Sequence, residues 1–402
     1  MSWEIKKLSV CCISIADGDH QAPPKSDSGV PFVTISNINA SNQFDFTNTM
    51  FVPQEYYDGL DSKRKAQKGD ILYSVVGSFG IPVYMKETVP FVFQRHIAIL
   101  RPNDTILPQF LYYTMLSRDF YMQADAAALG AAQRTISLSA LRNMKIAVPP
   151  LDVQQKIVAN LSAYDDLIEN NQKQIKLLEE AAQRLYKEWF VDLRFPGHEN
   201  TPIVDGVPEG WKQGKISDFV STFSGGTPSR THPEYYSGGT NLWVKTQELN
   251  DGFIFYTEEK ITNAAISNSS AKIIPQGSIL MAMYGATIGK LGIAAKELTC
   301  NQACCVFDST KMRFATSYLF LWLKENRNFF ISQGKGAAQP NLSQAMIKNF
   351  DISIPPDDVL LAFSKVTDTI LERIANLQLQ NLGLIEARDR LLPKLMNGEI
   401  EV

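Results

Sequence analysis

The chain has 402 residues, 45% hydrophobic and 20% charged, which are globular values that leave room for two or three domains. A formal net charge of −3 and a pI near 5.9 exclude a nucleic-acid binder that depends on bulk positive charge, so any DNA binding must rest on local basic residues or on partner subunits. No apolar run is long enough to span a membrane and no secretion signal is evident, so we expect a cytoplasmic protein without membrane contact.

The first 150 residues predict a strand-rich head with short helices. Clusters of β-branched and aromatic residues between Gly, Pro and Asn residues predict the strands, and Pro108–Arg118 predicts a helix packed on them. The predicted strands are Pro31–Ile38, Asp70–Val76, Phe91–Leu100 and Lys145–Val148.

A long amphipathic helix is predicted from Asp152 to Asp192. Pro149 and Pro150 precede it, Asp152 occupies the expected N-cap position, and Gln155 occupies the capping-box position. Its core-facing residues recur at steps of four and three, which is a heptad seam with one polar interruption. The seam residues are Ile157, Leu161, Tyr164, Ile168, Asn171, Ile175, Leu178, Ala182, Leu185 and Trp189. One helix cannot bury such a stripe alone, so we expect a partner.

Residues 195–210 are rich in Pro and Gly, which is typical of a linker. A second strand-rich segment follows, and Ser317–Asn328 predicts a helix within it. Its predicted strands are Asn241–Thr246, Ser278–Met283 and Thr299–Phe307.

A second heptad seam begins at Asp357, and each of its residues lies 206 positions after a counterpart in the first. They are Phe363, Thr367, Ile370, Ile374, Leu377, Asn381, Leu384, Arg388, Leu391 and Leu395. Two ordinary core helices would explain each seam alone, but matched seams favour an intramolecular antiparallel coiled coil. If both seams are centred alike, facing residue numbers add to 552 and Asn171 faces Asn381, a pairing that fixes register at some cost in stability.

The heads are also repeated. KGDIL at 68–72 recurs as QGSIL at 276–280, and GAAQ at 130–133 recurs at 336–339. The sequence therefore predicts an α+β fold with two strand-rich domains in tandem repeat, separated by two long helices. The predicted segments are the first head at 1–150, the central helix at 151–195, the linker and second head at 196–356, and the C-terminal helix at 357–402.

No motif for catalysis, cofactor binding or metal binding is found. The phosphate loop, the G-x-S-x-G elbow, H-E-x-x-H, a glycine-rich S-adenosylmethionine loop and the Asn-Pro-Pro-aromatic motif of adenine methyltransferases are all missing. The five cysteines form no C-x-x-C pair and are expected to be small buried residues rather than ligands. We therefore expect a chain that catalyses no reaction and holds no cofactor or metal.

Two polar loops are candidates for binding: SGGTPSRTH at 224–232 and QGKGAAQPNLS at 333–343. Gln and Asn can pair with adenine edges, Arg and Lys with guanine edges, and Ser or Thr with phosphate. The candidate DNA-binding residues, including the first-head equivalents, are Gln133, Arg134, Thr227, Ser229, Arg230, Lys335, Gln339 and Asn341. A polar surface turn would explain each loop alone, although the presence of a matching loop in both copies favours binding.

Several segments together carry a family resemblance: SGGTPSR followed by EYYSGG, the GAAQ-x-x-I/L-S repeats, IAVPPLDVQQKI, ISIPPDDV and LYKEWFVDLRFPG. With its two-copy layout, the whole chain resembles the DNA-specificity subunits of type I restriction-modification systems. The resemblance implies two target-recognition domains that each recognise half of an asymmetric, bipartite site in double-stranded DNA through the major groove. It also implies helices that set the spacing and dock subunits.

The same resemblance implies assembly with two methyltransferase subunits and two restriction or motor subunits, which would bind S-adenosylmethionine, ATP and Mg²⁺. The helix residues expected at spacer or subunit contacts are Ile157, Leu161, Ile168, Asn171, Leu178, Trp189, Ile374, Asn381 and Leu391. Two alternatives stay open at this point. One is a two-headed coiled-coil scaffold that binds proteins only, which the near-neutral charge permits. The other is a recognition module of another restriction-modification class.

Overall fold

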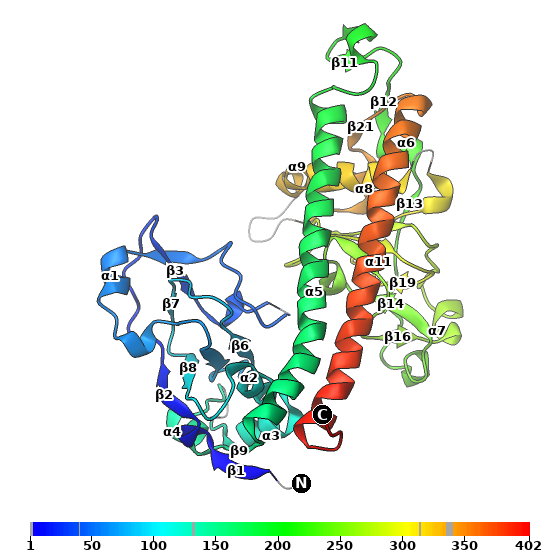
Figure 1. Ribbon diagram of the computed structural model, residues 1–402. Helices are drawn as coiled ribbons and strands as arrows, with labels where there is room; N and C mark the ends of the chain where they lie inside the picture. Colours follow the sequence, from blue (N-terminus) through cyan, green and yellow to red (C-terminus); the bar gives the residue numbers. More distant parts are fainter. Residues whose placement is uncertain (1–2, 40, 131–132, 313–314, 335–340) are drawn as a thin grey trace. The chain divides into compact units, whose positions relative to one another are not determined.

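The computed structural model describes residues 3–39, 41–130, 133–312, 315–334 and 341–402 (Figure 1). The chain divides into two compact units. Unit 1 comprises Met1–Leu167 and Leu384–Val402, and unit 2 comprises Ile168–Gly383. Each unit therefore contains one head together with a segment of each long helix.

The described residues of the first head form three small sheets. A four-stranded antiparallel sheet has the order β2 (Cys12–Asp17), β8 (Ile97–Pro102), β5 (Ile71–Ser74) and β6 (Pro82–Tyr84). A three-stranded sheet has the order β4 (Met50–Val52), β3 (Val30–Val33) and β7 (Val92–Phe93), and β1 (Glu4–Lys7) pairs with β9 (Lys145–Val148). The helices are α1 (Gln54–Asp58), α2 (Pro108–Leu116), α3 (Arg118–Ala127) and α4 (Leu138–Asn143).

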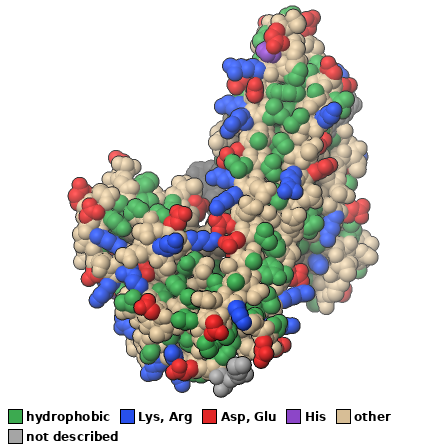
Figure 2. All heavy atoms as spheres, viewed as in Figure 1, with side chains coloured by type: hydrophobic (Ala, Val, Ile, Leu, Met, Phe, Trp, Pro, Cys, Tyr) green, Lys and Arg blue, Asp and Glu red, His purple; other side chains and the backbone are tan. Residues whose placement is uncertain are grey.

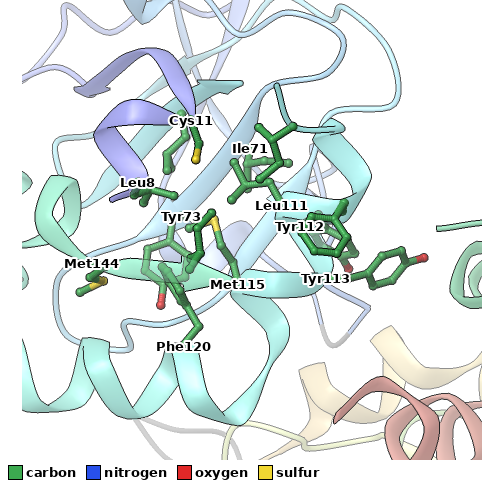
Figure 3. Packing of buried hydrophobic residues seen from close by; sticks show 14 of the residues in the cluster. Leu8, Cys11, Ile71, Tyr73, Leu111, Tyr112, Tyr113, Met115, Phe120 and Met144 are labelled. Atoms are coloured by element: carbon green, nitrogen blue, oxygen red, sulfur yellow. The ribbon is translucent and has the colours of Figure 1, made fainter. Parts of the chain in front are cut away.

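The core of the first head lies between β5 and the helices α2 and α3. Figure 3 shows Ile71 and Tyr73 of β5 beside Leu111 of α2 and Phe120 of α3, all essentially without solvent exposure. The Tyr73 and Phe120 rings meet edge to face with centroids 5.7 Å apart. Full burial of one such side chain contributes about 1.5–3 kcal/mol, so this apolar layer holds the sheet and its helices together.

The second head repeats this topology. Its larger sheet has the order β13 (Thr222–Ser224), β20 (Cys304–Phe307), β17 (Ile279–Ala282), β18 (Leu291–Ala294) and β15 (Gly252–Ile254). Its three-stranded sheet has the order β16 (Lys260–Ile261), β14 (Asn241–Val244) and β19 (Thr299–Cys300), and β12 (Lys212–Lys215) pairs with β21 (Asp351–Ile354). The helices are α6 (Ile216–Phe219), α7 (Asn263–Ser267), α8 (Thr316–Glu325), α9 (Arg327–Gln333) and α10 (Gln344–Lys348).

Strand pairing confirms the internal repeat in detail. In the first head β3 pairs in parallel with β7 and antiparallel with β4. In the second head β14 pairs in parallel with β19 and antiparallel with β16. The parallel strand β15, added at the edge of the larger sheet in unit 2, is absent from the first-head sheets that the structure describes.

Two segments were predicted as single strands, and this is wrong because each contains two strands. The segment predicted at 91–100 is β7 and β8, separated by a turn in which the Ile97 amide donates to the Gln94 carbonyl. The segment predicted at 299–307 is likewise β19 and β20, with a turn at Asn301. In both heads the turn moves the chain from the small sheet to the large one. An apolar run predicts burial but carries no sign of such a change of sheet.

The predicted linker at 195–210 has more structure than its composition indicates. β10 (Ile203–Val204) and β11 (Val207–Pro208) form a hairpin within it. Asp205 and Gly206 make the turn with φ of 50° and 80°, the left-handed backbone that a two-residue hairpin turn requires and that Asp-Gly adopts readily.

A partly buried ionic cluster fixes one loop of the second head. Asp251, with φ of 68°, receives hydrogen bonds from Lys290, from the Leu291 amide and from the Arg327 guanidinium. Burial raises the pKa of the Asp251 carboxyl, but the hydrogen bonds from Arg327 and Lys290 outweigh it and the net pKa is lowered. The carboxylate therefore ties the loop before β15 to β18 and α9.

The long helices are α5 (Leu151–Tyr186), continued by a π-helical turn at Lys187–Val191, and α11 (Asp357–Met396). The predicted N-cap is wrong: α5 begins one residue before Asp152, which lies inside the first turn. The Pro150 carbonyl accepts the hydrogen bond of the Gln154 amide instead. The buried Gln154 side chain bonds the backbone of Leu107, Thr105 and Pro149, so this glutamine, not Gln155, anchors the helix start.

The antiparallel register predicted for the two seams is confirmed within unit 2. The Asn171 amide donates to the Asn381 carbonyl oxygen over 2.9 Å, and both side chains are buried. At the far end of the seam the rings of Trp189 and Phe363, whose numbers also add to 552, lie 5.6 Å apart. Within unit 2, the segments of α5 and α11 therefore pack as an antiparallel pair with the two asparagines matched (Figure 1).

Candidate nucleic-acid interface

The loop at 224–232 follows β13 and lies tightly against its neighbours. A Cβ atom at Gly225 would lie 2.2 Å from the Cys300 carbonyl oxygen, and one at Gly226 would lie 2.3 Å from the Ser270 carbonyl carbon. The Gly226 amide also donates to the Cys300 carbonyl over 2.9 Å. Close backbone approach therefore explains the double glycine, and it holds the loop in one position.

Arg230 is positioned by a carboxylate and two aromatic rings. Its Nη2 donates to Glu259 Oε2 over 2.7 Å. Its guanidinium carbon lies 4.0 Å from the Tyr236 ring centre and 5.7 Å from that of Trp243. The hydrogen bond between the two residues raises the pKa of Arg230 and lowers that of Glu259. The side chain is nevertheless 57% exposed, so the guanidinium is both oriented and accessible.

The two rings also hold the loop backbone. The Tyr236 hydroxyl donates to the Pro228 carbonyl over 2.6 Å, and the Trp243 indole nitrogen donates to the Gly226 carbonyl over 3.0 Å. Arg230 therefore packs on the same two side chains that fix its own loop.

The hydroxyls of the loop are engaged within the protein. Thr227 Oγ1 donates to Gln302 Oε1, and Ser229 Oγ lies 2.7 Å from Thr231 Oγ1. Both candidate residues are thus placed on the same loop as Arg230. Each hydroxyl oxygen can still accept a hydrogen bond.

In the first head, Gln133 and Arg134 lie on the segment that joins α3 to α4. Gln133 is exposed. Arg134 donates from Nη1 to Asp125 Oδ1 over 2.6 Å and from Nη2 to the Asp125 backbone carbonyl. Its guanidinium lies 5.2 Å from the centre of the Phe79 ring. Arg134 therefore ties this segment to the end of α3.

The second candidate loop is described only in part. Lys335 and Gln339 lie outside the described residues. Asn341 is exposed, and the amide of the following Leu342 donates to the Met283 carbonyl over 2.8 Å. The loop thus returns to the end of β17, beside the central strands of the larger sheet.

The predicted seam residues lie in both units. In unit 1, Ile157 and Leu161 are buried, Leu391 packs beside them, and Asp165 accepts from Arg388 over 2.7 Å and from the Tyr113 hydroxyl over 2.6 Å. Burial of the Arg388 guanidinium lowers its pKa, yet the hydrogen bonds to Asp165 and Asp389 outweigh that and the net pKa is raised.

In unit 2 the seam residues Ile168, Asn171, Ile374 and Asn381 are buried, and Leu178 and Trp189 are partly buried. All of them pack inside the chain. A contact of these helices with another subunit stays a prediction.

A family model described as the type I restriction modification DNA specificity domain matches the chain twice, at residues 3–180 and 208–383. The chain belongs to the family of type I restriction-modification DNA-specificity subunits.

Curated relatives agree with this assignment. The chain is 27% identical to the type I restriction enzyme MjaIX specificity subunit of Methanocaldococcus jannaschii, over 85% of this chain and 80% of the relative. It is 24% identical to the HindI specificity subunit of Haemophilus influenzae, over 92% and 95% of the two chains. The crystal structure of the type I S subunit from M. genitalium shares the fold, with a TM-score of 0.59 and 14% identity over 98% of this chain and 96% of that one.

The surface of this specificity subunit carries both signs of charge. On the face shown in Figure 2, Lys and Arg side chains alternate with Asp and Glu side chains, in keeping with a net charge of −3. Among the described residues, no group of three or more His, Cys, Asp or Glu side chains could hold a metal ion. The helices of the described part include none long and apolar enough to cross a membrane.

The carboxylates and rings that orient the arginines could not be identified from the sequence. Glu259 lies 29 residues after Arg230 and Asp125 lies nine residues before Arg134, and no motif links the members of either pair. The one available signal was the run EYYSGG at 234–239, which contains Tyr236 and is separated from the loop by Pro233 alone. Three-dimensional contacts alone identify Glu259 as part of this site.

Proposed function

We propose that each head of this specificity subunit recognises one half of an asymmetric, bipartite site in double-stranded DNA through the major groove. The observation that carries the proposal is the presence of two heads with one topology but different loop residues. Shared framework with different contact residues suits two recognition modules that accept different base sequences. The oriented, exposed Arg230 supports a DNA-contacting role for the loop of the second head.

The long helices would set the distance between the two half-sites. α5 has 36 residues and is about 54 Å long. The buried Asn171–Asn381 pair gives α5 and α11 a single register. A rigid connector of fixed register determines the separation of half-sites as subunit geometry does in dimeric DNA-binding proteins. The outer faces of the same helices would dock methyltransferase subunits.

The catalytic work would belong to the partners. We propose assembly with two methyltransferase subunits and two restriction or motor subunits, which would bind S-adenosylmethionine, ATP and Mg²⁺. This chain would catalyse no reaction itself and would act in the cytoplasm. The relatives' names as specificity subunits of restriction enzymes support this division of labour.

Alanine at Arg134, Arg230 and Lys335 together tests the DNA-binding loops. Loss of three positive groups from phosphate or base contacts should weaken specific binding by the assembled methyltransferase by at least about tenfold, since one base contact alone is worth about 1–3 kcal/mol. Binding is measured at fixed, near-physiological salt, because phosphate contacts depend strongly on salt. Unchanged affinity would remove these loops from the DNA interface.

A further inference from the structure

Arg230 differs from an ordinary surface arginine in how completely its direction is fixed. The Tyr236 ring covers one face at 4.0 Å, and Glu259 holds one guanidinium nitrogen at 2.7 Å. The same Glu259 oxygen, Oε2, also lies 3.7 Å from Lys245 Nζ, which helps to hold the carboxylate. Toward the described residues, Arg230 donates from one of its five guanidinium N–H groups, and more than half of the side chain is exposed.

A phosphate contact does not require this arrangement. A phosphate attracts any nearby cation, and a carboxylate at 2.7 Å would partly offset the charge on which that attraction depends. Two N–H groups aimed together at O6 and N7 of guanine, by contrast, depend on the direction of the planar fork. Fixing that fork before binding reduces the entropy lost when the contact forms.

We propose that Arg230 recognises a guanine edge in the half-site of the second head, and that Glu259 is the positioning residue that sets the direction of its guanidinium. This inference rests on the proposed function, since it assumes that the loop at 224–232 meets DNA. It adds a base contact and a role for a residue outside the predicted site.

The first head provides a contrast. Arg134 also has a carboxylate and a ring beside it, but its Nη1 donates to the Asp125 carboxylate and its Nη2 donates to the Asp125 backbone carbonyl. Both terminal nitrogens already bond the end of α3. Arg134 is therefore an anchor of its segment, and the guanine contact is assigned to Arg230 alone.

The test uses the assembled methyltransferase and its own target site, found by methylome sequencing. Dissociation constants are measured for the cognate duplex, for duplexes in which each G·C pair of the second half-site is replaced, and for an unrelated duplex. The variants are Arg230→Lys, Arg230→Ala and Glu259→Gln. Lys311→Ala, which removes one exposed positive charge from the same head, is the charge-matched control.

Arg230→Lys keeps the charge but loses the fork, so it should weaken cognate binding about as much as Arg230→Ala, by roughly 10- to 100-fold. On the duplex in which the recognised G·C pair is replaced, both Arg230 variants should bind with the same affinity as the wild type. Glu259→Gln should give a smaller loss at that same base pair. Lys311→Ala should change the dissociation constant only slightly, and by the same factor for every duplex.

Other outcomes overturn the inference. If Arg230→Lys binds like the wild type while Arg230→Ala weakens all duplexes equally, Arg230 contacts phosphate, and one head per half-site still stands. If Arg230→Ala changes nothing, the loop lies away from DNA. A second half-site without guanine overturns the proposal as well. Thermal melting checks the fold, and if the alanine variant fails to fold, the lysine and Glu259→Gln variants still decide.

Discussion

Replacing Asn171 by leucine tests the buried amide pair that fixes the register of α5 and α11. The substitution leaves the Asn381 amide buried, 8% exposed, without the hydrogen bond it now makes over 2.9 Å. A buried polar group that loses its partner costs about 1–3 kcal/mol. Asn381→Leu should cost a similar amount.

The double variant gives the sharper result. With leucine at both Asn171 and Asn381, no amide is left unpaired and two apolar side chains meet, so the free energy of unfolding should return close to the wild-type value or exceed it. The coupling between the two substitutions should therefore be about 1–3 kcal/mol in favour of the double variant. This coupling energy requires the free energy of unfolding of four proteins: the wild type, the two single variants and the double variant.

Urea unfolding followed by far-UV circular dichroism measures all four free energies. Asn170→Leu is the matched control: this neighbouring asparagine is exposed, and its replacement should change the free energy by no more than about 0.5 kcal/mol. If the two single substitutions add without coupling, Asn171 and Asn381 do not act as a pair and the register argument fails.

Two further predictions concern the second head. Because the pKa of Asp251 is lowered in the folded state, its charge stabilises the fold above the unfolded pKa near 3.9. This contribution is lost as pH falls through the folded pKa. The free-energy difference between wild type and Asp251→Asn, from urea unfolding at each pH, should be constant above about pH 5 and shrink below about pH 4; a difference that grows on acidification contradicts the assigned direction. Gln378 Oε1 accepts from the Phe253 amide over 3.0 Å, so Gln378→Ala should destabilise unit 2 by about 1–3 kcal/mol. The exposed Gln380→Ala serves as its control, and equal effects of the two would deny the contact a role.

The helical part of the fold could be predicted from the sequence because a heptad seam has a strict period. Asn171 and Asn381 interrupt two seams related by one offset, so their pairing followed from residue numbers alone. The start of α5 could not be fixed to one residue. Asp152 has the residue type of an N-cap, but the backbone contacts of the buried Gln154 decide where the helix begins.

The sequence predicted that the heads are rich in strands, but it did not predict which sheet each strand joins. Apolar runs located the strands, but they could not show that the turns at Gln94 and Asn301 pass the chain between sheets. The candidate site was likewise predicted in part. Residue type selected Arg230, whereas its orientation depends on Glu259 and Tyr236. Such contacts form only when distant segments pack, so no local pattern records them.

The central claim is that each head recognises its own half of the DNA site, and exchange of one head tests it most directly. Residues 196–356 are replaced by the second head of another specificity subunit, and the methylome of cells carrying the matched methyltransferase is sequenced. We expect a hybrid motif in which one half-site is unchanged and the other becomes that of the donor subunit. A methylated motif identical to the wild-type motif would contradict recognition by one head per half-site.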